Sequence, residues 1–148
     1  MLNTKQRGNV TEVECMLAFL KLGYNVLTPY GDCERYDFVV DINGALYKVQ
    51  VKSANENHID EGYIEFNTSN KTTRNGKFVR HAYDKEHIDY CMTAYKGKCY
   101  LVPVDECTTT SKRLRFIPPK NGQIKGITFA QEYELEGMVN KIVNELHF

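Results

Sequence analysis

The sequence YDFVVDINGALYKVQVKS, residues 36–53, carries the strongest fold signal in the chain. Residues 36–42 and 45–53 are rich in β-branched and aromatic side chains, which is typical of strands. Between them stands Asn43-Gly44, a pair that tolerates the positive φ angles of a type I′ turn. We therefore predict a β-hairpin with a two-residue turn.

The predicted turn also sets the pairing of the two strands. If Ile42 pairs with Ala45, Asp37 lies directly opposite Gln50, with their Cβ atoms about 5 Å apart. Strand alternation places Lys52 on the same polar face, one step further along. The other face is predicted to join the core, since it carries Phe38, Val40, Ile42, Ala45, Tyr47, Val49 and Val51.

The three polar side chains suit hydrolysis of a phosphodiester bond. That reaction needs a hard cation to offset charge on the phosphate and the leaving oxygen, together with an activated water. Asp37 and Gln50 can supply two of the oxygen ligands that Mg²⁺ prefers, and Lys52 can stabilise the phosphate or help generate hydroxide. The same pattern is also typical of a solvated hairpin face, on which Asp41 and Lys48 form an ordinary cross-strand ion pair.

Helices are predicted near both ends of the chain. Residues 9–22 have the spacing of one buried helical face, followed by Gly23 as a C-terminal cap, with apolar side chains at Val10, Val13, Met16, Leu17 and Leu20. A second helix is predicted near the C-terminus from Leu135, Met138, Val139, Ile142 and Leu146. Further strands are predicted at residues 24–30, 62–67, 88–95 and 99–104, and a loop at residues 68–76. Residues 108–126 are turn-rich and polar around a short apolar stretch at 114–117, and they are assigned to no element.

The order of these elements resembles the PD-(D/E)XK nuclease superfamily. Glu12 lies on the first helix, followed by Tyr36-Asp37 and then by Gln50-Val51-Lys52 on the next strand. The resemblance covers roughly residues 3–55. It implies an α/β (α+β) fold with a restriction-endonuclease-like αβββαβ core, in which helices flank a mixed sheet.

The resemblance also implies roles for the site residues. Asp37, Gln50 and Glu12 become metal ligands together with Val51 of the tripeptide, and Lys52 becomes catalytic. Two positions depart from the family pattern: Tyr36 stands in place of Pro, and Gln50 in place of an acid. Because Gln50 removes a negative charge, Glu12 is the residue expected to compensate; its alternative role is an ordinary acid near a helix N-terminus.

Gln50, Arg35-Tyr36-Asp37 and the later run Tyr100-Leu101-Val102-Pro103 are similar to the branch that includes group I intron homing endonucleases. The implied activity is Mg²⁺-dependent cleavage of double-stranded DNA, with Mn²⁺ as a substitute cation. A Holliday-junction resolvase is the enzymatic alternative. From another class, the chain is alternatively a nuclease fold that binds nucleic acid or protein without cleaving.

A cationic segment is a candidate DNA contact. No acidic residue lies between Glu65 and Asp84, and Asn75-Gly76 indicates a turn that could enter a groove. The alternative is a flexible solvated loop. The predicted phosphate contacts are Lys71, Arg74, Lys77 and Arg80, with Arg7 and Arg35 elsewhere.

Composition limits the remaining possibilities. The 148 residues are expected to form a single domain, residues 1–148, and the zero net charge means that any basic surface is local. The five cysteines include no Cys-x-x-Cys pair, which argues against a zinc site. With no apolar run of signal-peptide or membrane-spanning length, a cytoplasmic protein is expected. Since one active site cuts one strand, a double-strand break calls for a homodimer or higher homo-oligomer.

Overall fold

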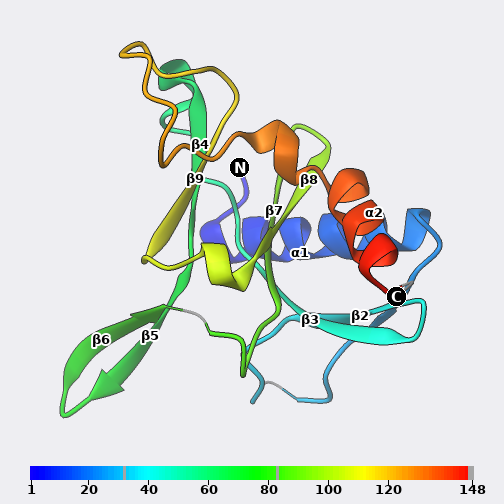
Figure 1. The fold of residues 1–148 in the computed structure, drawn as a ribbon. Coiled ribbons are helices and arrows are strands. Elements are labelled where there is room, and N and C mark those ends of the chain that lie inside the picture. Colours follow the sequence, from blue (N-terminus) through cyan, green and yellow to red (C-terminus); the bar gives the residue numbers. More distant parts are fainter. Residues whose placement is uncertain (32, 83, 147–148) are drawn as a thin grey trace.

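A computed structural model describes residues 1–31, 33–82 and 84–146 of the chain. Its centre is a five-stranded sheet in the order β1-β2-β3-β7-β8 (Figure 1). Its strands are β1 (Asn25–Leu27), β2 (Phe38–Ile42), β3 (Ala45–Val51), β7 (Tyr90–Tyr95) and β8 (Lys98–Pro103). The predicted mixed sheet of an α+β fold is confirmed, because β3 and β7 are parallel whereas the other neighbours are antiparallel.

The β2–β3 hairpin has the predicted turn and register. Asn43 and Gly44 have φ angles of 52° and 93°, as a type I′ turn requires. The Asp41 carboxylate accepts a hydrogen bond of 2.8 Å from the backbone N–H of Gly44, which closes the turn. Ile42 pairs with Ala45, and the same register continues to Phe38 and Val49 at the far end of β2.

Both predicted helices are present, but the buried face of the first one was predicted wrongly. Helix α1 (Thr4–Lys21) begins with a capping box between Asn3 and Gln6. It buries Cys15 and Phe19, and it leaves exposed the side chains of Val10, Val13, Leu17 and Leu20. The spacing does not distinguish the faces, because apolar residues lie on both sides of this helix, and the larger Phe19 ring packs inward against Phe38.

Helix α2 (Leu135–Glu145) buries four of the five apolar residues that were predicted to face the core, whereas the fifth, Leu146, caps the helix and is exposed. Its buried side chains are Leu135, Met138, Val139 and Ile142. They join Cys15 and Phe19 of α1 in one core cluster with side chains from one face of the central sheet. Within the described part of the chain, neither helix is long and apolar enough to cross a membrane.

The crossover from β3 to β7 contains most of the remaining structure. It comprises the 3₁₀ helix η1 (Ile59–Glu61), β4 (Tyr63–Asn67), β5 (Ser69–Arg74) and β6 (Lys77–Ala82). Strand β4 pairs with β9 (Ser111–Arg115), and two short 3₁₀ helices, η2 (Val104–Glu106) and η3 (Ala130–Tyr133), follow β8 and precede α2. This layer forms a second core cluster, which includes Ile64, Phe66 and Leu114, against Cys91 and Val102 of the sheet.

The predicted loop at residues 68–76 was wrong, because β5 and β6 form an antiparallel hairpin there. Asn75 and Gly76, with φ angles of 53° and 73°, make its turn. Figure 1 shows this hairpin projecting away from the body of the molecule. The sequence did not indicate these strands, because it lacks the alternation of apolar residues that marks a half-buried strand.

The inward face of α1 can be tested by unfolding. We expect Phe19→Ala to lower the free energy of unfolding by about 3–5 kcal/mol, because the fully buried ring leaves a cavity. The matched control, Leu46→Ala, removes an exposed side chain of β3 and is expected to change it by less than about 0.5 kcal/mol. Urea denaturation followed by circular dichroism measures both, and similar values for the two variants would contradict the assigned core.

Candidate active site

Asp37 immediately precedes β2 and forms hydrogen bonds with the backbone of β3. Its N–H donates to the carbonyl of Val49 over 2.8 Å, and its carboxylate Oδ2 accepts a 2.7 Å hydrogen bond from the N–H of Val51. The side chain is partly buried. Burial raises the pKa of Asp37, and the Val51 hydrogen bond and the charge of Lys52 offset only part of this rise.

Glu12 on α1 lies close enough to Asp37 for the two carboxylates to repel each other. Burial is the larger cause of the raised pKa of Glu12, and the negative charge of Asp37 is the second. The position follows from the helix: Glu12 is seven residues before the buried Phe19, so both lie on the inward side. The hydroxyls of Thr11 and Ser53, 3.2 Å apart, tie this part of α1 to the chain that follows β3.

Gln50, Val51 and Lys52 run along the inner edge of the site. Gln50 is buried, stands opposite Asp37 in the extended register, and is paired with Cys91 of β7. Its Nε2 donates to the carbonyl of Val51 over 3.3 Å. The backbone N–H of Lys52 donates to the carbonyl of Met92 over 2.9 Å, which fixes this end of β3 on β7.

The structure therefore brings together the residues that were predicted from the hairpin and the first helix. Two partly buried carboxylates, Glu12 and Asp37, share a small region in which Lys52 is the cation that acts on Asp37. Both pKa values remain raised, chiefly because burial disfavours the charged form of each carboxyl group. A divalent cation suits this donor set, since carboxylate, amide and carbonyl oxygens are the ligands of Mg²⁺ and Mn²⁺.

A second acidic cluster lies elsewhere on the surface. Ligand atoms of Asp84, Glu86 and His87 lie within 4.8 Å of one another. The His87 ring is already engaged by Asp84, at 2.7 Å, and it lies 3.5 Å from the guanidinium of Arg35. Exposed acids often gather without an ion, so this cluster does not replace the Asp37 group as the candidate site.

A shallow hollow of about 300 Å³ lies beside the candidate site. It is lined by Arg7 and Thr11 of α1, by Ser53, and by Tyr95 and Lys96 at the turn between β7 and β8. Arg7 was predicted as a phosphate contact, whereas Lys96 was not singled out. Lys96 has a φ angle of 48° and lies in the Lys-Gly turn of the β7–β8 hairpin. No sequence pattern indicates that this hairpin lies near Ser53.

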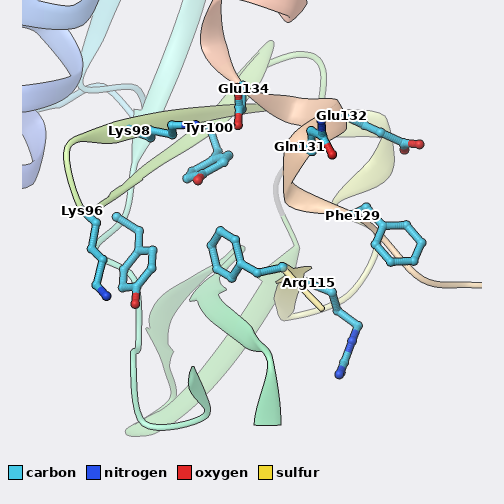
Figure 2. Close-up of a pocket in the computed structure, with 10 residues that line it drawn as sticks. Lys96, Lys98, Tyr100, Arg115, Phe129, Gln131, Glu132 and Glu134 are labelled. Atoms are coloured by element: carbon cyan, nitrogen blue, oxygen red, sulfur yellow. Dashed lines mark hydrogen bonds and ion pairs between the residues drawn. The ribbon is translucent and has the colours of Figure 1, made fainter. Parts of the chain in front are cut away.

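A larger hollow of about 720 Å³ adjoins the other side of the same turn and is lined by none of the predicted ligands. Figure 2 shows Lys96, Tyr100, Arg115 and Phe129 around it. Its charges are partly paired, since Lys98 Nζ lies 3.1 Å from a carboxylate oxygen of Glu134. The largest of these hollows is therefore separate from the group of Asp37, Glu12 and Lys52.

The structure describes the side chains of only some of the remaining predicted DNA contacts. Arg35 and Lys77 are exposed, the first near His87 and the second at the start of β6. The side chains of Lys71, Arg74 and Arg80 lie outside the described residues, although the backbone of β5 and β6 places all three on the projecting hairpin.

Comparison with known proteins gives the family. A family model described as PD-(D/E)XK endonuclease matches residues 2–136, a range that includes Glu12, Asp37, Gln50 and Lys52. The chain belongs to the PD-(D/E)XK endonuclease family. A search of curated proteins found no match.

A solved structure supports the same fold for this family member. The bacterial homing endonuclease I-Ssp6803I superposes with a TM-score of 0.78 over 99% of this chain and 100% of its own, at 24% sequence identity. At that identity the likeness establishes the restriction-endonuclease-like fold. It agrees with the predicted architecture.

The raised pKa of Asp37 predicts how the stability of the ion-free protein depends on pH. A carboxylate with a raised folded-state pKa destabilises the ion-free protein as pH rises through that pKa, because the folded state binds more protons than the unfolded state. We therefore expect Asp37→Asn to raise the melting temperature at pH 7 in a chelator, and to flatten its decline above about pH 4.

Thermal melting from pH 4 to pH 8 measures this effect. The amide oxygen of Asn can still accept the Val51 hydrogen bond, so the substitution removes chiefly the charge. Asp41→Asn is the matched control, because Asp41 also accepts a backbone hydrogen bond, from Gly44 in the exposed turn. An equal rise in both variants, or a fall in Asp37→Asn, would show that Asp37 carries no unfavourable charge.

Proposed function

We propose that the chain is a Mg²⁺-dependent endonuclease that hydrolyses phosphodiester bonds in double-stranded DNA, of the homing or mobile-element type. The observation that carries the proposal is the convergence of Asp37, Glu12 and Lys52 at the Gln50-Val51-Lys52 strand end. Membership of the PD-(D/E)XK endonuclease family and the likeness to a homing endonuclease support it.

Each residue has a distinct part in the proposed reaction. Asp37, Glu12, the Gln50 side chain and the Val51 carbonyl would hold Mg²⁺, or Mn²⁺ in its place. When bound, the cation supplies Lewis-acid stabilisation of charge on the phosphate. The ammonium of Lys52 stabilises the same negative charge and positions the attacking water, while the hydrogen bond from Val51 keeps the Asp37 carboxylate directed toward this edge.

The proposed DNA contacts come from α1, from the residues before β2 and from the β5–β6 hairpin. Arg7 lines the hollow next to Ser53, and the β5–β6 hairpin carries Lys71, Arg74, Lys77 and Arg80 at a distance from the body. Arg35 precedes Asp37 and is exposed. Cations at these positions would contact backbone phosphates, which fixes the duplex relative to the site without reading its sequence. Cleavage of both strands requires two such sites, and hence a homodimer or higher homo-oligomer.

Gln50 favours a second candidate function, a nuclease fold that binds DNA without cutting it. An amide replaces the expected acid, and it is turned toward the neighbouring carbonyl of Val51. If the chain has lost the ability to cleave, it should still bind DNA in the presence of Mg²⁺ but release no cleaved DNA.

Cleavage of supercoiled DNA with 5 to 10 equivalents of protein and Mg²⁺ tests the proposal, with a four-way junction as a competing substrate. We expect Asp37→Ala and Lys52→Ala each to lower the cleavage rate by roughly 100-fold or more, as the removal of a transition-state contact does. Lys48→Ala is the matched control. This lysine lies on the same strand, and its Nζ donates to the Glu86 carbonyl.

Equal cleavage by all variants would assign the activity to another site or a contaminant. Retained DNA binding with no cleavage by wild-type protein would favour the binding function, and preferred cutting of the junction would favour a resolvase.

The proposed phosphate contacts predict a salt dependence. We expect Lys77→Ala to weaken DNA binding about equally for all sequences, and to reduce the slope of log affinity against log salt by roughly 1. Fluorescence anisotropy between about 50 and 200 mM salt measures the slope. Lys125→Ala in the exposed segment before η3 is the control, and a slope unchanged by Lys77→Ala would remove the hairpin from the interface.

A further inference from the structure

Four of the five cysteines lie two by two on opposite faces of the central sheet. Cys15 of α1 is in the first core cluster, and Cys99 of β8 packs against the same cluster. Cys91 of β7 and Cys107, the residue after η2, lie in the second cluster. Because the sheet separates the two clusters, each of these cysteines has only one neighbouring thiol on its own face.

The thiols of Cys15 and Cys99 lie within reach of each other. The sulfur of Cys99 donates over 3.9 Å to the carbonyl oxygen of Glu14, which belongs to the peptide bond that joins Glu14 to Cys15. A hydrogen bond with Cys15 lowers the pKa of Cys99, and the same bond is the main cause of the raised pKa of Cys15. The Cys99 sulfur is therefore the one that more readily becomes a thiolate.

The second pair has the same kind of contact. A hydrogen bond between Cys91 and Cys107 raises the pKa of Cys91 and lowers that of Cys107. The sulfur of Cys107 also donates to the carbonyl of Pro103 over 3.6 Å. The chain thus contains two close thiol pairs with similar mutual contacts.

The two pairs differ in access from solvent. Cys91 and Cys107 are 0% and 1% exposed, so no reagent can reach either sulfur in the folded chain. Cys15 is also fully buried, but its partner Cys99 is partly exposed. Cys99 lines a hollow of about 440 Å³ that is bounded by the end of α1, the β7–β8 turn and the start of α2. A small molecule can therefore approach the first pair through Cys99.

We propose that Cys15 and Cys99 are a redox-sensitive thiol pair, which a low-molecular-weight disulfide such as oxidised glutathione converts to an intramolecular disulfide. Cys91 and Cys107 stay reduced in the folded chain, because their sulfurs are enclosed in the second core cluster. The proposal is independent of the proposed nuclease activity.

Two thiol–disulfide exchanges complete the reaction. The Cys99 thiol loses its proton, and the thiolate attacks one sulfur of oxidised glutathione, which forms a mixed disulfide and releases one glutathione thiolate. The Cys15 thiol then loses its proton, and its sulfur attacks the Cys99 sulfur and displaces the second glutathione thiolate. The protein gives up two electrons, and the two protons pass to the released thiolates. Oxidised glutathione is thereby reduced to two molecules of glutathione.

The new bond would join α1 to the edge strand β8. Cys15 lies three residues after Glu12, about one helical turn further along α1, so the bond adds a covalent tie to the helix that carries Glu12. It also closes a loop of residues 15–99 in the unfolded chain. We therefore expect the disulfide to raise the melting temperature by at least about 4 °C.

Oxidation of the folded Cys33→Ser chain by oxidised glutathione tests the proposal, since that substitution removes the exposed fifth thiol. The remaining thiols are then alkylated in denaturant, and digestion after Lys, Arg and Glu leaves each cysteine on a separate peptide. Mass spectrometry should show a Cys15–Cys99 disulfide, the loss of two hydrogen masses from the intact chain, and alkylation of Cys91 and Cys107.

Two substitutions in the same background control for the exchange steps. In Cys15→Ala the second exchange cannot occur, so we expect one glutathione to remain bound to Cys99. Cys91→Ala is the matched control, because it removes an equally buried thiol from the other pair, and it should leave the Cys15–Cys99 disulfide unchanged.

Circular dichroism melting of the reduced proteins verifies that each variant folds. If Cys15→Ala does not fold, Cys99→Ala takes its place, because Cys99 is only partly buried. That variant should acquire neither a disulfide nor glutathione, and its melting temperature should not rise on oxidation.

Four outcomes would overturn the proposal. Four alkylated cysteines after oxidation would show that Cys99 is not reached, and a stable glutathione adduct on Cys99 beside an intact Cys15 would show that the two sulfurs do not meet. Oxidation of Cys91 and Cys107 at the same rate would contradict the difference in access. A disulfide that leaves the melting temperature unchanged or lower would contradict its fit to the contact between α1 and β8.

Discussion

The two-residue reversal at Asn43 and Gly44 fixes which residues of β2 and β3 face each other, and the candidate site depends on that pairing. With Ile42 opposite Ala45, the N–H of Val51 comes within 2.7 Å of the Asp37 carboxylate. A shift of one residue would turn Asp37 to the opposite face of the sheet, among the apolar side chains of the core. The geometry of the candidate site therefore depends on the positive φ angles of Asn43 and Gly44.

The site also illustrates a conflict between stability and function. Glu12 and Asp37 are partly desolvated and close to each other, and in the absence of a cation this arrangement raises both pKa values. Side chains that pack only for stability would not place two acids there. The parallel pairing of β3 with β7 and the contact of Thr11 with Ser53 supply the rigidity that holds them together. A bound cation would convert the repulsion into shared attraction.

Much of this arrangement could be predicted from the sequence, because it depends on local signals. The hairpin register follows from a turn dipeptide and strand alternation, and α2 follows from a single apolar face. The inward face of α1 could not be predicted, because Val10, Val13, Leu17 and Leu20 match a buried face as well as Cys15 and Phe19 do. The β5–β6 hairpin was missed because its sequence carries no apolar periodicity, and Lys96 reaches the site region through tertiary packing. The family model matched residues 2–136, well beyond the roughly 50 residues in which the resemblance was visible.

The position of a cation in a crystal of the full chain soaked with Mn²⁺ tests directly whether Asp37 binds a metal ion. Anomalous diffraction locates that ion independently of the protein atoms. We predict an anomalous peak in contact with the carboxylate of Asp37, within reach of Glu12 and the Gln50-Val51-Lys52 strand end. A peak confined to Asp84, Glu86 and His87, with Asp37 bound to no ion, would contradict it.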